Sequence, residues 1–276
     1  MTYSAFQSLL IIAISILSFL LHTRAIHHDS SVSTGTTILA VRYQEGVIVG
    51  ADTRTSVSGY VSNRYANKIT FILDKERDLL AIPFVPDPSM SQLYNDGDNE
   101  SISSISPAAN AIEGSTCCIC RSGSSADTQY LADVVQLELV SRQILDSCPN
   151  TVSNVASLLR YIMSQDDNLL ASLICAGYDH MLKRGTIYSL SPGGAWMEEP
   201  IWTTSGSGSS FITGYVESKL SGILLDEEEA IAMVSAAIEF AIHRDTNSGG
   251  YIVLYVINKN GKRMITHRPK NLKIQR

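Results

Sequence analysis

The sequence predicts an α+β fold, a four-layer αββα sandwich in which two β-sheets lie between outer layers of helices. Three observations predict it. The ordered part opens with two strongly apolar, β-rich runs, continues with helical periodicities, and returns to strands on either side of further helical sequence. Strands that are apolar at most positions are usually covered on both faces. Each sheet then needs the other sheet on one face and helices on the opposite face.

The first half of the chain supplies two strands and two helices. Residues 37–43 and 47–51 are β-rich runs, and Gln44-Glu45-Gly46 between them is a hairpin signal. From Ala126 the pattern becomes helical. Apolar residues recur at helical spacing from Leu131 and again from Val155, which predicts two helices with one apolar face each.

The second half returns to strands. The apolar run at residues 169–176 predicts a buried strand, and residues 186–190 predict a strand that pairs with the chain after Gly193-Gly194. Asp226 and Glu229 form an Asp-x-x-Glu pattern, which resembles a capping box and predicts that a helix begins there. Residues 251–257 and 263–266, on either side of Asn260-Gly261, predict a closing hairpin.

Composition narrows the classes of function. The 276 residues are 45% hydrophobic and 17% charged, as in globular proteins with a core. The net charge of −6 argues against a nucleic-acid-binding protein, which normally has a basic face. Five cysteines do not form a disulfide framework. The cluster Cys117-Cys118-x-Cys120 lacks the second pair that a zinc site needs, so we expect buried thiols, no metal and no organic cofactor.

Two segments fit the predicted domain poorly. The apolar run at residues 9–21 is too short for a confident membrane span, and no Lys or Arg precedes it as in a signal peptide. Secretion or anchoring, removal on maturation, and an imperfect gene model all remain open for it. Residues 75–115 are mostly polar and rich in turn residues, so we expect a disordered insertion. A retained intron is equally compatible with that segment.

The chemistry concentrates at Thr36, where the ordered domain starts after Gly35. If the chain is cut between these residues, Thr36 gains a free α-amine with an unperturbed pKa of about 7.7–8.0. That amine can take the proton of the Thr36 hydroxyl, whereas the amide of the uncut chain cannot. A nearby cation would lower both pKa values, and a carboxylate would hold the cation in place. Lys68 and Asp52 fit these roles, although each alone would read as part of a surface ion pair.

Four motifs in family order carry a resemblance. The run from Thr36 to Thr70 (TTILAVRYQEGVIVGADTRTSVSGYVSNRYANKIT) looks like the opening of an active proteasome beta subunit. CRSGSSADTQ from Cys120, GSGSSFITGYV from Gly206 and RDTNSGG from Arg244 look like its later landmarks. The resemblance implies the N-terminal-nucleophile hydrolase fold, with a leader at residues 1–35 that is removed and a protease domain at residues 36–276. Alone, the Ser/Gly-rich run 205–210 would read as a flexible loop.

The resemblance also assigns roles to single residues. Thr36 is implied to be the nucleophile, with Asp52 and Lys68 as its supporting pair. Ser207, Asp245 and Ser248 are implied to complete the hydrogen-bonded site, and the Gly123 amide to donate to the oxyanion. Substrate-channel positions are matched by Thr55, Ser56, Gly123 and Ser125, along which an extended peptide would add as a strand.

Arg121 matches the family position at the base of the pocket for the residue before the scissile bond. A guanidinium there would pair with a substrate Asp or Glu, so the chain resembles the caspase-like type of catalytic subunit. The alternative is an arginine with only internal partners. The family also implies partners, namely other alpha and beta subunits in stacked seven-membered rings, a peptide or unfolded protein as substrate, and a location in cytoplasm and nucleus without stable membrane association.

One departure and three alternatives accompany this interpretation. Lys68 and Arg121 are much further apart than in the family, because residues 75–115 intervene at a hairpin tip. An insertion there can loop out of the sheet but can also hinder ring neighbours. The alternatives are a non-catalytic ring subunit, another N-terminal-nucleophile hydrolase, and a secreted or membrane-anchored binding protein that rests on residues 9–21 alone.

Overall fold

Two antiparallel sheets form the centre of the protein. The computed structural model describes residues 35–57, 60–74, 115–146 and 150–269. The first sheet has the order β10 (Trp202–Ser205), β1 (Ile38–Tyr43), β2 (Gly46–Asp52), β11 (Ile252–Asn258) and β12 (Gly261–His267). The second has the order β5 (Ile69–Leu73), β6 (Thr116–Gly123), β7 (Ala171–Asp179), β8 (Arg184–Leu190) and β9 (Trp196–Glu199).

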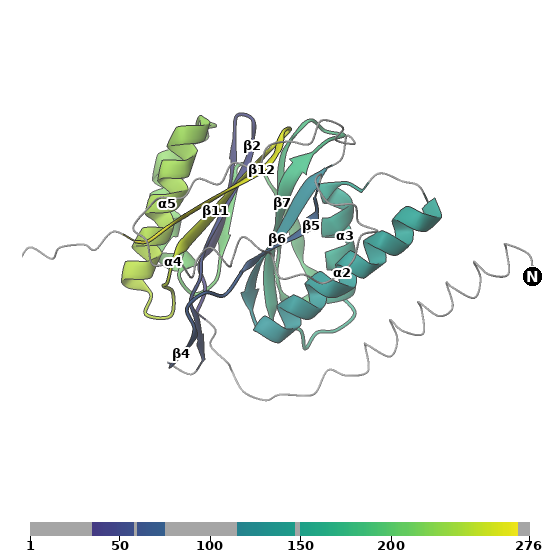
Figure 1. Cartoon of the computed structure of the whole chain (residues 1–276), viewed down its shortest axis with the longest axis horizontal. Helices are drawn as coiled ribbons and strands as arrows, with labels where there is room; N and C mark the ends of the chain where they lie inside the picture. The colour runs from purple at the N-terminus through teal and green to yellow at the C-terminus, as the bar shows by residue number, and fades with distance from the viewer. Residues whose placement is uncertain (1–34, 58–59, 75–114, 147–149, 270–276) are drawn as a thin grey trace, which may run out of the picture. The chain divides into compact units, whose positions relative to one another are not determined.

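Helices cover the outer face of each sheet (Figure 1). Helices α2 (Ser125–Asp146) and α3 (Val152–Met163) share an apolar core with the second sheet, whereas α4 (Ser209–Leu220) and α5 (Glu227–Arg244) share one with the first. A third apolar cluster fills the space between the sheets. The predicted four-layer αββα sandwich is therefore confirmed.

The alternation of side chains along β1 explains why this strand is apolar almost throughout. Leu39 and Val41 face the helices α4 and α5, while Ile38 and Ala40 face the second sheet. Both faces are thus buried, as the sequence predicted. The predicted hairpin is also present, with Tyr43 paired to Gly46 across a turn of two residues.

Helix α5 lies close against the first sheet because Gly50 has no side chain. A Cβ atom at Gly50 would lie 2.5 Å from Cδ1 of Ile238 on α5. The helix begins where the sequence predicted, since the Asp226 carboxylate accepts the backbone N–H of Glu229 at 2.9 Å. Asp245 lies at the C-terminal end of α5, where it is the C-cap residue.

The remaining predictions for secondary structure differ mainly in detail. The closing hairpin forms from β11 and β12 as predicted, and the strand expected at residues 169–176 is β7, displaced by two to three residues. Sequence reasoning missed the small sheet of β3 (Thr55–Val57) and β4 (Tyr60–Asn63) and the strand β10. The run 205–210, which taken alone is typical of a flexible loop, ends β10 at Ser205, turns over residues 206–208 and begins α4 at Ser209.

The two segments that fitted the domain poorly lie almost entirely outside the described residues. Residues 1–34 and 75–114 belong to this group. Ser115 is described, and its buried hydroxyl accepts the backbone N–H of His180 at 3.0 Å. The strands on either side of the long segment, β5 and β6, pair antiparallel, with Ile69 opposite Cys120. No helix in the described part of the chain is long and apolar enough to span a membrane.

Candidate active site

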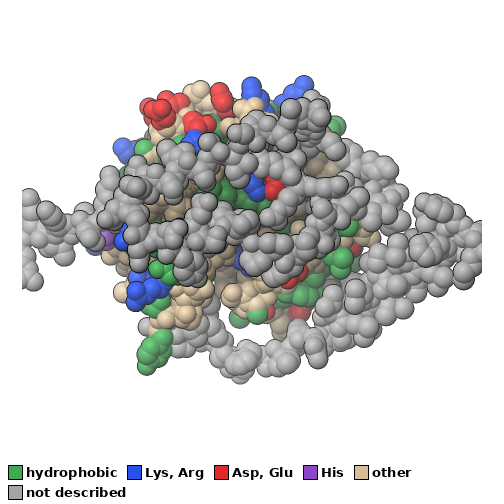
Figure 2. All heavy atoms as spheres, viewed as in Figure 1, with side chains coloured by type: hydrophobic (Ala, Val, Ile, Leu, Met, Phe, Trp, Pro, Cys, Tyr) green, Lys and Arg blue, Asp and Glu red, His purple; other side chains and the backbone are tan. Residues whose placement is uncertain are grey.

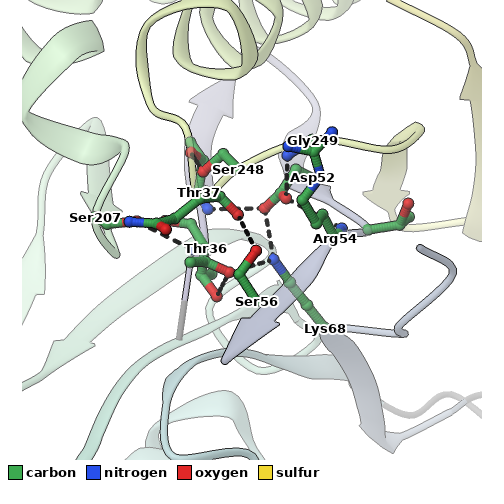
Figure 3. Close-up of polar contacts among 12 residues, drawn as sticks. Thr36, Thr37, Asp52, Arg54, Ser56, Lys68, Ser207, Ser248 and Gly249 are labelled. Atoms are coloured by element: carbon green, nitrogen blue, oxygen red, sulfur yellow. Dashed lines mark hydrogen bonds and ion pairs between the residues drawn. The ribbon is translucent and has the colours of Figure 1, made fainter. Parts of the chain in front are cut away.

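Thr36 lies just before β1 in a buried pocket of polar groups (Figure 3). The Thr36 hydroxyl donates to the carbonyl oxygen of Gly35 at 2.7 Å. The ammonium group of Lys68 donates to the same oxygen at 3.0 Å. The carbonyl of the Gly35–Thr36 peptide bond therefore accepts two hydrogen bonds, one of them from a cation. Such donors polarise a carbonyl toward nucleophilic attack.

Asp52 is a fully buried carboxylate at the end of β2 that organises the surrounding chain. Its Oδ1 binds Lys68 Nζ at 2.7 Å and accepts the backbone N–H of Thr37 at 2.8 Å. Its Oδ2 accepts the backbone N–H groups of Gly249 at 2.9 Å and Arg54 at 3.2 Å. A buried charge is tolerated when it is paired and hydrogen-bonded, and Asp52 meets both conditions.

A second buried carboxylate, Asp245, holds a chain of hydroxyl groups. Its Oδ2 accepts from Ser207 Oγ at 2.6 Å and from Ser248 Oγ at 2.7 Å. Because each serine gives its proton to Asp245, Ser207 accepts from the Thr36 nitrogen at 3.2 Å, and Ser248 accepts from the Thr37 hydroxyl at 2.8 Å. The direction of every hydrogen bond in this chain is thus fixed.

Burial and hydrogen bonding shift the pKa values of two of these groups. Burial lowers the pKa of Lys68, and the nearby Asp52 carboxylate opposes this effect. For Asp245, burial alone would raise the pKa, but hydrogen bonds from Ser207, Ser248 and the Asn247 backbone outweigh it, so that the pKa is lowered. Asp245 is therefore an anion at neutral pH that accepts rather than donates hydrogen bonds.

Glycines allow the chain to pass close to the candidate nucleophile. A Cβ at Gly35 would lie 2.1 Å from the carbonyl oxygen of Asn247, and one at Gly206 would lie 2.2 Å from the Thr36 oxygen. Gly123, at the end of β6, has φ +108° and borders the Leu170 carbonyl, so a side chain there would be strained as well as blocked. No other residue fits these three positions without movement of the backbone.

Comparison with known proteins places this arrangement in one family. Residues 32–76 and 105–257 match the family described as "Proteasome subunit". "Proteasome subunit beta type-6" of Dictyostelium discoideum is 34% identical, over 84% of this chain and 89% of the relative. "Proteasome subunit beta type-1" of Saccharomyces cerevisiae is 32% identical, over 86% and 90%. "Probable proteasome subunit beta type-1" of Encephalitozoon cuniculi is 36% identical, over 83% and 90%.

The chain belongs to the proteasome subunit family. The resemblance drawn from the four motifs is confirmed, because relatives named as beta subunits match over most of the chain. As a member of this family, the protein is a component of the proteasome core that assembles with other proteasome subunits.

Arg121 of this proteasome subunit lies beside Lys68, since its backbone N–H donates to the Lys68 carbonyl at 2.8 Å. The guanidinium is partly buried. It donates to Gln129 Oε1 and to the Asn67 carbonyl, both at 2.6 Å. Burial lowers the pKa of Arg121, and the Asp133 carboxylate opposes this. Both direct acceptors are neutral, so among the described residues the positive charge of Arg121 has no anion in direct contact.

The predicted substrate-channel residues of the proteasome subunit differ in exposure. Ser125, the first residue of α2, is exposed, and Thr55 on β3 is partly exposed, so both can meet a ligand. Ser56 is buried, and its hydroxyl donates to the Asn247 carbonyl at 3.2 Å. Its side chain therefore supports the loop that carries Asp245 and Ser248 rather than an open surface.

Sequence reasoning missed three groups at the site. The Thr37 side chain joins the hydroxyl chain, the Asn247 carbonyl borders Gly35, and the Gly249 amide binds Asp52. The sequence could have indicated the role of Thr37, because Thr37 follows the candidate nucleophile and is a polar residue at the start of the largely apolar predicted strand 37–43. The roles of Asn247 and Gly249 are played by backbone groups, which residue type does not reveal.

The four described cysteines of the proteasome subunit are buried free thiols. Burial raises the pKa of Cys117, which keeps this thiol protonated. In the part of the chain that the structure describes, no group of three or more His, Cys, Asp or Glu side chains is placed to hold a metal. Cys148 lies outside the described residues.

Proposed function

We propose that this proteasome subunit is a catalytic one, a threonine endopeptidase whose nucleophile is Thr36. One observation carries the proposal. Lys68 Nζ binds Asp52 at 2.7 Å and at the same time donates to the carbonyl next to Thr36 at 3.0 Å. A structural ring member has no need for a buried cation directed at its own peptide bond, since burying such a charge is costly.

Activation begins with the peptide bond between Gly35 and Thr36. The Thr36 oxygen attacks the Gly35 carbonyl carbon, which Lys68 polarises, and the bond between that carbon and the Thr36 nitrogen breaks. The proton that the Thr36 hydroxyl loses passes to the nitrogen, which becomes an amine, while Gly35 is held as an ester on the Thr36 oxygen. Water then hydrolyses the ester, which releases the leader with a Gly35 carboxylate and leaves Thr36 with a free amine and a hydroxyl.

The mature site hydrolyses peptides by the same chemistry. The Thr36 amine takes the hydroxyl proton as the oxygen attacks the substrate carbonyl carbon. Lys68 favours the deprotonated oxygen through its charge, and the Gly123 amide stabilises the oxyanion. The proton passes to the leaving nitrogen as the peptide bond breaks, and water hydrolyses the acyl ester on Thr36. Ser207 and Asp245 hold the amine, because the Thr36 nitrogen lies 3.2 Å from Ser207 Oγ.

Arg121 supports a preference for substrates with Asp or Glu before the scissile bond. Its guanidinium is held in place by neutral acceptors, so its charge is left for a substrate carboxylate. Thr55 and Ser125 would line the path of the extended peptide. By analogy with the family, the chain would act inside stacked seven-membered rings of alpha and beta subunits, in cytoplasm and nucleus, on unfolded protein chains.

The test uses the full chain assembled with its partner subunits. Intact mass measures whether the chain begins at Thr36, and fluorogenic peptides ending in Asp or in Leu measure activity and preference. We expect a mature N-terminus at Thr36 and faster hydrolysis after Asp. The Thr36→Ala variant should assemble, keep its leader and lose this activity. A wild-type chain that keeps Gly35 joined to Thr36 in the assembled particle would refute the proposal.

A further inference from the structure

A cationic pocket lies at the end of the sandwich furthest along β1 from Thr36. It has a volume of about 430 Å³. Its lining comes from the strand ends and turns of β1–β2, β7–β8 and β11–β12, together with Leu224 in the loop between α4 and α5. Four of its lining side chains are cations, Arg42, Lys183, Arg184 and Lys259, against the single carboxylate of Glu45. Figure 2 shows Lys and Arg side chains at the top of the view, where these turns lie in Figure 1, with a group of Asp and Glu side chains beside them.

This concentration of positive charge runs against the composition of the chain. The whole protein carries a net charge of −6, so an average patch of its surface is expected to be acidic. Glu45 is exposed to solvent, so its charge is partly screened by water and salt. Glu198 binds Arg184 at 2.7 Å, but both side chains of this pair are more than 40% exposed. Exposed pairs of this kind contribute little to stability, and the four cations outnumber these two carboxylates, so the pocket keeps a net positive charge.

Arg42 at the wall of the pocket is incompletely satisfied. It lies in β1, where its backbone N–H donates to the Ile201 carbonyl, and its side chain is partly buried. Its Nε is buried and has no hydrogen-bond partner among the described residues. Burial and the neighbouring Arg184 lower the pKa of Arg42, and the Glu198 carboxylate opposes this. A buried donor without a partner is unfavourable. An anion in the pocket would offset the repulsion between Arg42 and Arg184.

The turn that carries two of the cations is supported by hydrogen bonds to a buried carboxylate. Asp179 at its start is buried, and its Oδ1 accepts the backbone N–H groups of Met181 at 2.9 Å and Leu182 at 3.1 Å. Lys183 follows with φ +52°, a conformation that side chains rarely adopt. The two hydrogen bonds to Asp179 support the turn from which Lys183 and Arg184 line the pocket.

We propose that this pocket binds a small organic oxyanion, a molecule that carries phosphate or carboxylate groups on an apolar frame. The cations supply charge-assisted hydrogen bonds to the oxyanion. Tyr43, Tyr178 and Leu224 supply apolar walls, and the volume exceeds that of a single phosphate and falls within the usual range of ligand sites. The site lies about 20 Å from Thr36, because six residues of extended chain separate Thr36 from Arg42. It is therefore distinct from the candidate active site and does not depend on the proposed peptidase activity.

Calorimetric titration of the assembled full chain at fixed ionic strength tests this inference. The probes are inorganic pyrophosphate and citrate, which separate a preference for phosphate from one for carboxylate. We expect saturable binding of at least one probe, and tighter binding of either one identifies the class of ligand. Lys183→Met and Lys259→Met lie on different turns, and each should weaken binding about tenfold, as expected for the loss of one charged hydrogen bond.

Lys219→Met is the matched control, because Lys219 is an exposed lysine on α4 that does not line the pocket. It should bind both probes as the wild type does, and all variants should keep the thermal midpoint of the wild type. The inference is overturned if neither probe binds saturably to the wild type. It is also overturned if Lys219→Met weakens binding as much as the two pocket variants, since binding would then follow overall charge.

Discussion

Gly35→Ala should block maturation of the chain by steric conflict alone. The added Cβ would lie 2.1 Å from the Asn247 carbonyl oxygen and 2.2 Å from the Asn247 Cβ. An ordinary contact needs at least 3.4 Å, so backbone must move by about 1.3 Å on one side or the other. The Asn247 loop resists this movement, because its carbonyl accepts from Ser56 and its N–H donates to Asp245.

The expected effect on rate follows from this displacement. Gly35 carries the carbonyl that Thr36 must attack. Asn247 lies two residues after Asp245, which orients the Thr36 nitrogen through Ser207. A misplacement of about 1 Å can slow a positioned reaction by about 100-fold. We therefore expect the Gly35→Ala precursor to mature about 100-fold more slowly than the wild type.

The assay follows the loss of precursor by intact mass after assembly with the partner subunits. The mature chain begins at Thr36 and no longer contains residue 35, so any Gly35→Ala chain that does mature should have wild-type activity per mature chain. Gly214→Ala on α4 is the matched control, because nothing lies within 4 Å of its added Cβ. Maturation of Gly35→Ala at the wild-type rate would refute the steric argument.

Three further predictions test the parts of the site separately. Lys68→Met should lower the rate of peptide hydrolysis by about 100-fold or more. Because it leaves Asp52 buried without its cation, it should also lower the free energy of unfolding by about 3–5 kcal/mol. Turnover and urea unfolding measure the two effects, and unchanged turnover would exclude an electrostatic role for Lys68. The lowered pKa of Asp245 stabilises the fold at pH values above its ordinary pKa of 3.8, and this stabilisation should be lost as the pH falls through the lower pKa of the folded state. Asp245→Asn should lack this pH-dependent stabilisation when unfolding is followed at decreasing pH. Identical acid unfolding curves for the variant and the wild type would contradict the prediction. Arg121→Leu should lower kcat/KM for peptides ending in Asp by about 10–100-fold while peptides ending in Leu gain, whereas an equal loss for both would indicate a purely structural arginine.

Sequence patterns predicted the parts of the fold that bury apolar residues on a regular period. The hairpin of β1 and β2, the start of α5 at Asp226 and the closing hairpin all follow from local signals. The β3–β4 sheet was missed because all four residues of β4 are exposed and show no alternation. Helix α4 was obscured by the serines and glycines at its start, which serve the site rather than the helix.

The candidate site was predictable only at positions where the residue type itself indicates a chemical role. Thr36, Asp52 and Lys68 combine a nucleophile, a carboxylate and a cation, and the structure brings all three together. Ser207, Asp245 and Ser248 came from the family resemblance, since neither spacing nor periodicity brings residues so distant in sequence together. The neutral partners of Arg121, Gln129 and Asn67, depend on the packing of α2 against the second sheet, which no local pattern specifies.

The position of the site between the two sheets links its reactivity to completed folding. Asp52 ends β2 in the first sheet, while Lys68 directly precedes β5 in the second, so their ion pair joins the two sheets. Thr36 lies just before β1, and Asp245 lies directly after α5, which packs on the outer face of the first sheet. A chain whose sheets have not yet packed therefore lacks both the cation at the Gly35 carbonyl and the hydroxyl chain at the Thr36 nitrogen. If the proposed function holds, cleavage after Gly35 cannot precede the packing of the sandwich, and the order of folding before activation is set by the fold itself.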